Sequence, residues 1–334
     1  MTPLPSMKSK NVQLVIAIFT PFISLVSSSS SFNVYNYDLN TPVFTPDGEL
    51  KQVEYAAEAS SHSYPMIIVP CALNGDKTLI IMATRNKPQR AQSRIIEMPI
   101  SHGAQNSGEA SLLFGVNGIL SDCVSLLQTA REEIQSIQRS YGAPSMSFAL
   151  VSSSSRPPLH SVKCAKKVAL AIADKCQQHS FGGGIRPFGA EIAICGMDNA
   201  GNIAIFVTEP SGSVLEFTSH ANDGGYVIGG DSRKREELKL ALQSKEMSST
   251  DHNELKDDSD RMKIREQIHQ AINAFIQVYK DEEVGENRGD KTAQEIILDE
   301  IDLVMTHSSK GVFRMTGKML KNVMEKHAVS ATKD

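Results

Sequence analysis

Residues 37–59 read YDLNTPVFTPDGELKQVEYAAEA and combine a turn signal with a helical stretch. The letters TPDG at 45–48 are typical of a turn that starts a helix, because proline pre-sets one of the turn positions. The pattern then predicts a helix over 50–60. An apolar, β-branched run follows at 66–73, so the sequence predicts a helix placed directly before a strand.

Beyond this stretch, blocks of apolar strands alternate with pairs of helices. We expect strands at 66–73, 78–84, 94–98, 111–116, 190–195, 203–207, 214–217, 301–306 and 312–315. Helical spacing of apolar residues is found at 120–137, 162–176, 233–242 and 268–276. Hairpin-connected strands with paired helices predict an α+β fold, a four-layer αββα sandwich of two antiparallel sheets. The two main strand blocks, 66–116 and 190–217, are expected to stack face to face.

Composition limits the possible functions. The 334 residues are 40% hydrophobic and 22% charged with a net charge of −4, which is typical of a globular protein without a nucleic-acid partner. The nine histidines are scattered and form no HExxH pattern, so no metal is expected. The glycine-rich stretch at 181–189 matches neither phosphate-binding template and is expected to be a turn before a buried strand. No cofactor is predicted.

The cysteines indicate a reducing environment. They are odd in number and lack CxxC spacing, and most lie in apolar runs, so we expect reduced, buried thiols. The five are Cys71, Cys123, Cys164, Cys176 and Cys195.

The first 36 residues read differently from the rest. Lys8 and Lys10 precede an apolar stretch at 12–26 and a serine run, the pattern of a signal peptide. The alternative is a start codon placed upstream of a cytosolic protein. We therefore expect a leader or extension at 1–36, with membrane contact only if the leader is retained.

Three stretches together resemble the α-type subunits of the proteasome core. The first is 37–59, with Tyr37 and Asp38, then FTPDG at 44–48 and QVEYA at 52–56. The second is 118–133, where Gly118 and Asp122 match the start of a family helix. The third, GGIRPFGAEIAICGMD at 183–198, matches a family strand motif. The family residues within this third stretch are Arg186, Pro187 and Gly189.

The resemblance covers about 37–320 and implies the N-terminal-nucleophile hydrolase fold. The stretch 244–260 is unusual for the family and is expected to be a surface loop, because it has little apolar surface to offset the entropy of ordering. Residues 321–334 are expected to be a tail. It also implies a non-catalytic subunit of a heptameric α ring that contacts other α subunits, β-ring subunits and a regulatory ATPase particle. Such a subunit would assist ring assembly and substrate gating in ubiquitin-dependent protein degradation, in the cytoplasm and nucleus. If the leader acts as a signal peptide, the alternative is that it directs the protein to the endoplasmic reticulum or to a secondary-plastid compartment.

The family contains a catalytic β type, and one feature separates the two types. Catalytic subunits expose an N-terminal threonine whose free amine is the general base for its own hydroxyl. A helix at 50–60 before the first strand is incompatible with that design, and Thr84 stands where the catalytic type carries an aspartate. We therefore expect no catalytic residue. The alternatives are a processed hydrolase that exposes Ser61 or Ser63, or a scaffold paralogue outside the ring.

The resemblance also implies two binding features. Tyr37, Asp38, Pro46 and Tyr55 correspond to the cluster that holds the gate open when a regulator docks. The alternative is a plain turn that only starts the helix. Arg94 corresponds to the lysine that pairs with the C-terminal carboxylate of a regulatory ATPase, and an arginine can bind a carboxylate through two nitrogens. A solvated arginine at a strand end is the alternative.

Overall fold

The structure is a computed structural model. It describes residues 43–73, 78–86, 93–100, 111–141, 161–181, 186–197, 202–218, 225–243, 256–283, 292–307, 311–315 and 317–331. The predicted leader at 1–36 lies outside these residues, as do Tyr37 and Asp38.

Two five-stranded antiparallel sheets form the centre of the molecule. In order across the first sheet, the strands are β10 (Gly311–Met315), β9 (Ile301–His307), β2 (Thr78–Arg85), β1 (Met66–Ala72) and β8 (Tyr226–Ile228). In order across the second, they are β3 (Ile95–Pro99), β4 (Ser111–Gly118), β5 (Ala190–Met197), β6 (Ile203–Thr208) and β7 (Val214–Thr218).

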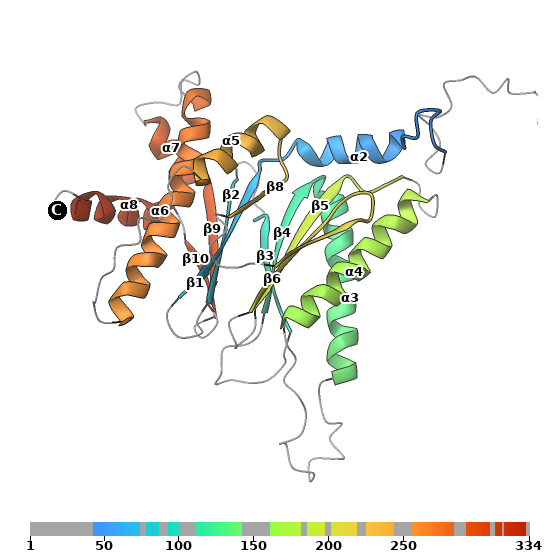
Figure 1. Ribbon diagram of the computed structural model, residues 1–334, viewed down its shortest axis with the longest axis horizontal. Helices are drawn as coiled ribbons and strands as arrows, with labels where there is room; N and C mark the ends of the chain where they lie inside the picture. The colour runs from blue at the N-terminus through green and yellow to red at the C-terminus, as the bar shows by residue number, and fades with distance from the viewer. Residues whose placement is uncertain are drawn as a thin grey trace, which may run out of the picture.

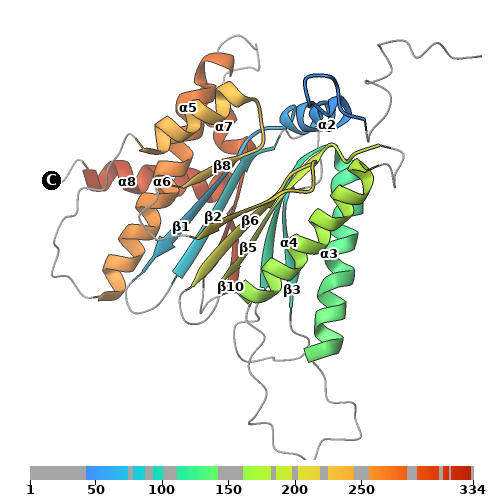
Figure 2. The same cartoon turned by 45° about the vertical axis from the view of Figure 1, so that its right-hand side comes forward.

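Helices cover the outer face of each sheet (Figures 1 and 2). The first sheet is covered by α5 (Ser232–Gln243), α6 (Lys256–Glu283), α7 (Ala293–Glu300) and α8 (Gly317–Ala331). The second is covered by α3 (Leu120–Tyr141) and α4 (Ser161–Ser180). The predicted four-layer αββα sandwich is confirmed.

The strand sequences are almost continuously apolar because both faces of each sheet are covered. In β1, Ile67 and Val69 pack against the helices while Met66 and Ile68 pack between the sheets. In β4, Phe114 faces the helices and Leu113 faces the opposite sheet. Alternate residues therefore build three apolar cores, one between the sheets and one under each helical layer.

The assignment of strands to sheets differs from our expectation. The two strand blocks do not each form a sheet. The hairpin of β1 and β2 pairs with the late strands β8 and β9, while β3 and β4 join β5 in the other sheet. The expectation was wrong because these pairings are non-local, and the apolar pattern of a strand does not specify its partner.

Some helical boundaries also differ. The polar stretch expected as a loop over 244–260 is partly helical, because α6 begins at Lys256 and Asp260 is buried. The expected tail from residue 321 falls within α8, whose Leu320 packs in the core under the first sheet. Three elements were not predicted: β8, α7 and α8.

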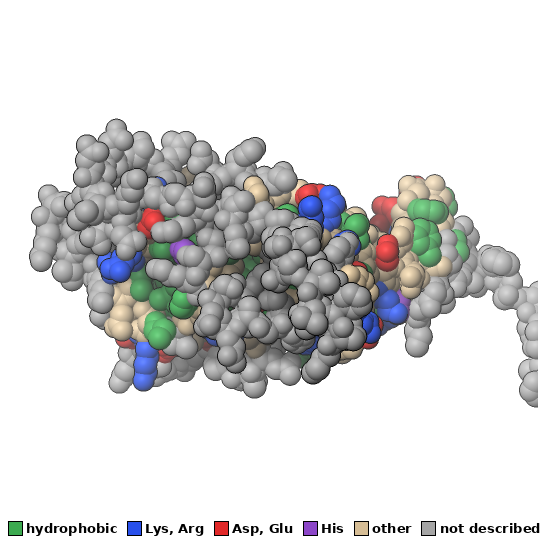
Figure 3. Space-filling model, turned by 90° about the horizontal axis from the view of Figure 1, so that it is seen from below, with side chains coloured by type: hydrophobic (Ala, Val, Ile, Leu, Met, Phe, Trp, Pro, Cys, Tyr) green, Lys and Arg blue, Asp and Glu red, His purple; other side chains and the backbone are tan. Residues whose placement is uncertain are grey.

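α2 (Lys51–Ser61) lies across one end of the sandwich, against β4 and β5 (Figure 1). It buries only Ala56 and Ser60 and leaves the opposite side exposed. Acidic and basic side chains are interspersed over the described part of the face in Figure 3. All five cysteines are buried thiols outside any disulfide, as expected. Among the helices that the structure describes, none combines the length and apolarity needed to span a bilayer.

Candidate functional site

The turn before α2 is closed by hydrogen bonds within 45–49. The amide nitrogen of Gly48 donates to the Thr45 carbonyl oxygen (2.8 Å), and that of Thr45 donates to the Glu49 carbonyl oxygen (2.9 Å). Gly48 has a φ of 84°, a conformation that favours glycine. The predicted turn at TPDG and the helix that follows it are both confirmed.

Two residues of the expected gating cluster can be placed. Pro46 lies in this turn and is exposed, and Tyr55 is 50% exposed on α2. Phe44, just before the turn, is also exposed. The gating role of these residues, together with Tyr37 and Asp38, stays a prediction.

The junction between α2 and β1 is tied to the strands around it. The Ser63 hydroxyl donates to the Ser60 carbonyl oxygen (3.0 Å) and accepts from the Gly118 amide (3.2 Å). The Thr84 hydroxyl donates to the Pro65 carbonyl oxygen (3.1 Å). The Ser61 hydroxyl donates within α2 to the Glu58 carbonyl oxygen (2.7 Å). In the intact chain, both serine hydroxyls are therefore engaged with main-chain groups.

Arg94 belongs to the same junction. Its side chain is buried, and its Nε and Nη1 donate to the carbonyl oxygens of Val116 (3.1 Å) and Tyr64 (2.9 Å). Its Nη2 donates to Asn117 Oδ1. The alternative of a solvated strand end is wrong, because the arginine is buried. The docking role of Arg94 stays a prediction, and its guanidinium is already engaged within the chain. The guanidinium instead joins the α2–β1 junction to β4.

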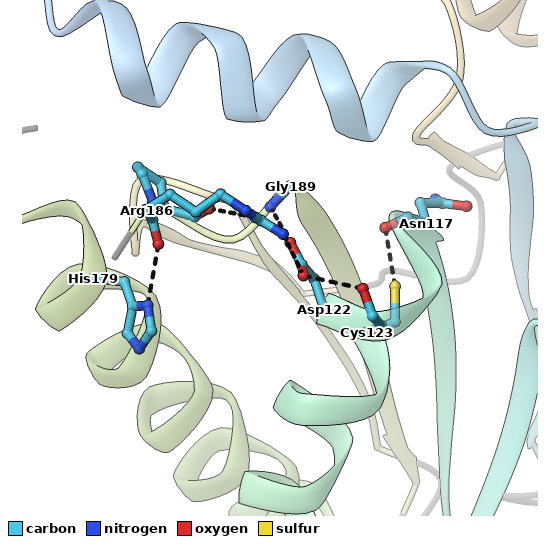
Figure 4. Close-up of polar contacts among 8 residues, drawn as sticks. Asn117, Asp122, Cys123, His179, Arg186 and Gly189 are labelled. Carbon is cyan, nitrogen blue, oxygen red and sulfur yellow. Dashed lines mark hydrogen bonds and ion pairs between the residues drawn. The ribbon is translucent and has the colours of Figure 1, made fainter. Parts of the chain in front are cut away.

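A second cluster joins the start of α3 to the segment before β5 (Figure 4). Arg186 Nη1 and Nη2 donate to Asp122 Oδ2 (2.6 Å) and Oδ1 (2.9 Å). The Gly189 amide also donates to Asp122 Oδ2 (2.9 Å). The carbonyl oxygen of Arg186 lies 3.1 Å from Nδ1 of His179 on α4. The carboxylate thus joins α3 to the segment before β5 beneath α2, and the main chain of Arg186 extends the cluster to α4.

The Asp122 carboxyl is ionised despite its burial. Burial would raise its pKa, but the hydrogen bonds from Arg186 and Gly189 outweigh burial and lower the pKa below its usual range. The paired carboxylate raises the pKa of Arg186 in turn. A bidentate arginine–carboxylate pair fixes both position and angle, so this cluster sets how α3 meets β5.

The glycines of this cluster allow a close approach of two chain segments. Gly118 has a φ of 103°, and a Cβ built on it would lie 2.2 Å from the Gly189 carbonyl oxygen. The same carbonyl accepts from the Ile119 amide (2.9 Å). Pro187 is buried beside them. The structure therefore brings together all five residues of the predicted family motif: Gly118, Asp122, Arg186, Pro187 and Gly189.

Comparison with known proteins assigns these features to one family. A family model described as the N-terminal signature of the proteasome A-type subunits matches residues 37–59. A second, described as a proteasome subunit, matches residues 159–246. Curated relatives with a similar sequence are named as proteasome alpha subunits. The chain is therefore similar to the proteasome α-type subunits, and for one relative the similarity extends over most of its length.

Three relatives of this family show the extent of the similarity. The proteasome alpha subunit of Pyrococcus horikoshii is 28% identical over 272 residues, covering 76% of this chain and 94% of the relative. That of Methanoculleus marisnigri is 30% identical over 181 residues, covering 54% of this chain and 64% of the relative. The proteasome alpha type-3 subunit of Dictyostelium discoideum is 28% identical over 181 residues, covering 54% and 62%. The latter two matches span less than two thirds of those relatives.

Proteasome α-type subunits are in general non-catalytic, and the junction after α2 is consistent with that type. The sequence reasoning missed two buried polar residues near it, Asn117 and Glu191. A signal was present in both cases, because Asn117 directly follows the apolar run 112–116 of β4 and Glu191 is the one charged residue of β5. Asn117 Oδ1 accepts a hydrogen bond from the Arg94 guanidinium, and Glu191 lines a groove beside α2.

Proposed function

We propose that this chain is a non-catalytic α-ring subunit of the proteasome core particle. One observation carries the proposal: α2 runs into β1 through a hydrogen-bonded junction at the point where a catalytic subunit would need a free N-terminal amine. The match of residues 37–59 to the N-terminal signature of the A-type subunits supports the same assignment. The chain is therefore expected to be without peptidase activity of its own.

The proposed partners are those of an α ring. Seven α subunits, this chain among them, would form a ring that contacts a β ring on one side and a regulatory ATPase particle on the other. In that position the chain contributes to ring assembly, to gating of substrate access and to regulator docking in ubiquitin-dependent degradation. The proposed location is the cytoplasm and nucleus. A full-length fluorescent fusion tests it, and accumulation in the endoplasmic reticulum or a plastid compartment would replace it.

The gating cluster is part of this proposal. Exposure of Pro46 and Tyr55 on and before α2 supports a contact surface there, and proline and tyrosine offer rigid contact area at low entropic cost. In an assembled core, Tyr55→Phe is expected to weaken stimulation of peptide hydrolysis by the regulator. Tyr226→Phe on β8, whose ring packs at a tilted angle against Phe217, is the matched control and should leave stimulation unchanged.

The decisive experiment is native mass spectrometry of the endogenous protein carrying a C-terminal tag. We expect the chain in a complex with other α and β subunits, and a mature N-terminus upstream of α2. A monomer without partners would support the scaffold alternative. A mature chain that begins at Ser61 or Ser63, and that reacts with a covalent inhibitor of N-terminal nucleophiles, would establish the processed hydrolase instead.

A further inference from the structure

A groove of about 410 Å³ lies between α2, the start of β5, the turn between β6 and β7, and the start of α5. Carboxylates line it from three sides. Glu54 and Glu58 come from α2, Glu191 from β5 and Glu209 from the β6–β7 turn. Arg235 of α5 is the one cation among the described lining residues. The groove is thus acidic, although the chain as a whole is only mildly so.

Two of these carboxylates already have partners. Glu54 pairs with Lys51 on the same helix (Oε2–Nζ 3.1 Å), and Glu209 accepts from the Ser213 hydroxyl. Glu58 makes only a long contact of 4.0 Å with exposed His62. Glu191 accepts a hydrogen bond from the Gly229 amide. Because a carboxylate can accept several hydrogen bonds, Glu58 and Glu191 keep further capacity to accept them.

Glu191 is the unusual member. Its side chain lines the groove although the residue is only 9% exposed, and it stands within a strand whose other residues are mostly apolar. Among the residues that the structure describes, no lysine or arginine forms an ion pair with it. Burial raises the pKa of its carboxyl to about 7, and nearby Glu209 adds to this, while Arg235 and the Gly229 amide oppose it. Ionising a buried carboxylate is costly, and a second cation in the groove would offset more of that cost than Arg235 does alone.

We propose that this groove binds the guanidinium or ammonium group of an arginine or lysine side chain presented by a partner polypeptide, with Glu191 as its deepest contact. The groove would supply Glu191 and Glu58 as charged acceptors. Ser60, Ser61 and Ser211 also line the groove. A guanidinium has five N–H donors and suits such a spread of acceptors.

Two observations favour a single organic cation over other positive ligands. Among the described residues, no three acidic, histidine or cysteine side chains converge closely enough to hold a metal ion. Arg235 on the α5 wall would repel the second charge of a polyamine. The site does not depend on ring assembly, so it can be tested separately from the proposed function.

The test uses the full-length chain and the peptide acetyl-Gly-Arg-Gly-amide, with the neutral citrulline peptide as a ligand control. Binding is followed by NMR titration at pH 6 and pH 8. Because the ionised fraction of a group with a pKa near 7 rises about tenfold between these values, the arginine peptide should bind about tenfold more tightly at pH 8. Its binding should also lower the pKa of the Glu191 carboxyl, read from the carboxyl ¹³C shift.

Two variants distinguish specific binding at Glu191 from a general effect of the negative charge of the protein. Glu191→Gln keeps the shape of the protonated side chain, so it should fold, lose arginine-peptide binding and lose the pH dependence. Glu216→Gln on β7, which removes an exposed carboxylate paired with Lys166, is the matched control and should bind as the wild type does. Equal binding of the citrulline peptide, unchanged binding by Glu191→Gln, or tighter binding of spermidine than of the arginine peptide would each overturn the proposal.

Discussion

At the residue scale, Asp122 shows how one carboxylate can organise a corner of the fold. It is 6% exposed yet charged, since it accepts two hydrogen bonds from Arg186 and one from the Gly189 amide. Arg186 is half exposed, so its own charge remains partly solvated. If the ion pair is broken, the buried Asp122 carboxylate therefore loses more electrostatic stabilisation than the solvated Arg186 guanidinium does.

Asp122→Asn is expected to lower the free energy of unfolding by about 2 kcal/mol at pH 7, because a charge-assisted bidentate pair becomes a neutral contact. Glu216→Gln, the same change in an exposed pair with Lys166, should cost no more than about 0.5 kcal/mol. Urea unfolding measures both. Equal losses for the two variants would contradict a special role for Asp122.

This contribution depends on pH with a definite sign. The folded pKa of Asp122 is lowered, so the stabilisation is present above the ordinary aspartate value of about 4 and is lost as the pH falls through the folded pKa. The stability difference between wild type and Asp122→Asn should therefore shrink below about pH 4. A difference that stayed constant down to about pH 2 would be inconsistent with this account.

Glu191 is expected to act in the opposite direction. Its folded pKa of about 7 lies above the unfolded value, so its contribution is present at low pH and is lost as the pH rises through 7. At pH 8, Glu191→Gln should be more stable than the wild type, by on the order of 3 kcal/mol at most. Chemical unfolding at pH 5 and pH 8 checks this, and a gain of the same size at both values would refute it.

At the element scale, the end of β4 can approach the segment before β5 closely only because residue 118 is a glycine. Gly118 has a positive φ and no room for a Cβ, whereas Gly48 has a similar φ of 84° with nothing within 4 Å of its Cβ position. Comparing substitutions at these two glycines therefore distinguishes the cost of backbone strain alone from the added cost of a steric clash.

Gly48→Ala is expected to cost about 1–2 kcal/mol, the penalty for a left-handed non-glycine residue. Gly118→Ala should cost more, about 3 kcal/mol or above, because its Cβ would also collide with the Gly189 carbonyl oxygen. Thermal and urea unfolding of both variants test the difference. If the two losses were equal, the close contact would not matter.

Local patterns in the sequence predicted most of the helices and strands. The elements that were missed have physical explanations. The long strands were found as apolar runs, and the helices α3 and α4 were found because the burial of one defined face gives a clear periodic spacing of apolar residues in the sequence. β8 was missed because it has only three residues. α7 was missed although Thr292 and Glu295 form a capping box that the letters contain.

The expected family motif, which spans the end of β4, the start of α3 and the segment before β5, forms one spatial cluster. The burial of Arg94 could not be predicted. Its partners, Tyr64 and Val116, come from distant segments, and a strand-end arginine carries no local sign of such contacts. The same non-local pairing explains why the strand blocks were assigned to the wrong sheets.

At the scale of the whole molecule, the distance between the two sheets depends on small residues that face the opposite layer. Gly115 of β4 is one of them, since a Cβ there would lie 2.2 Å from Met66 Sδ of β1 and 2.7 Å from Met82 Cε of β2. The two methionines, from the opposite sheet, fill the space that the glycine leaves.

Gly115→Val should destabilise the fold by about 2–3 kcal/mol, because overpacking of a closed core forces side chains off their rotamers. Gly115→Ala should cost less, since a methionine side chain can move aside. Gly311→Ala, which has a positive φ in an open hairpin, serves as a control for backbone strain alone. Unfolding curves in urea rank the three variants, and a valine variant as stable as the alanine variant would contradict tight packing between the sheets.

The buried cysteines make the chain easy to label at one chosen point. Burial raises the pKa of Cys71, Cys123 and Cys164 to about 11 and that of Cys176 to about 12, and it raises that of Cys195 as well. Maleimides react with thiolates, so the five native thiols should not be labelled at neutral pH while the fold is intact. A single cysteine introduced at exposed Ala57 of α2 would then carry a fluorophore beside the acidic groove, giving an optical readout of whatever docks on this end of the molecule.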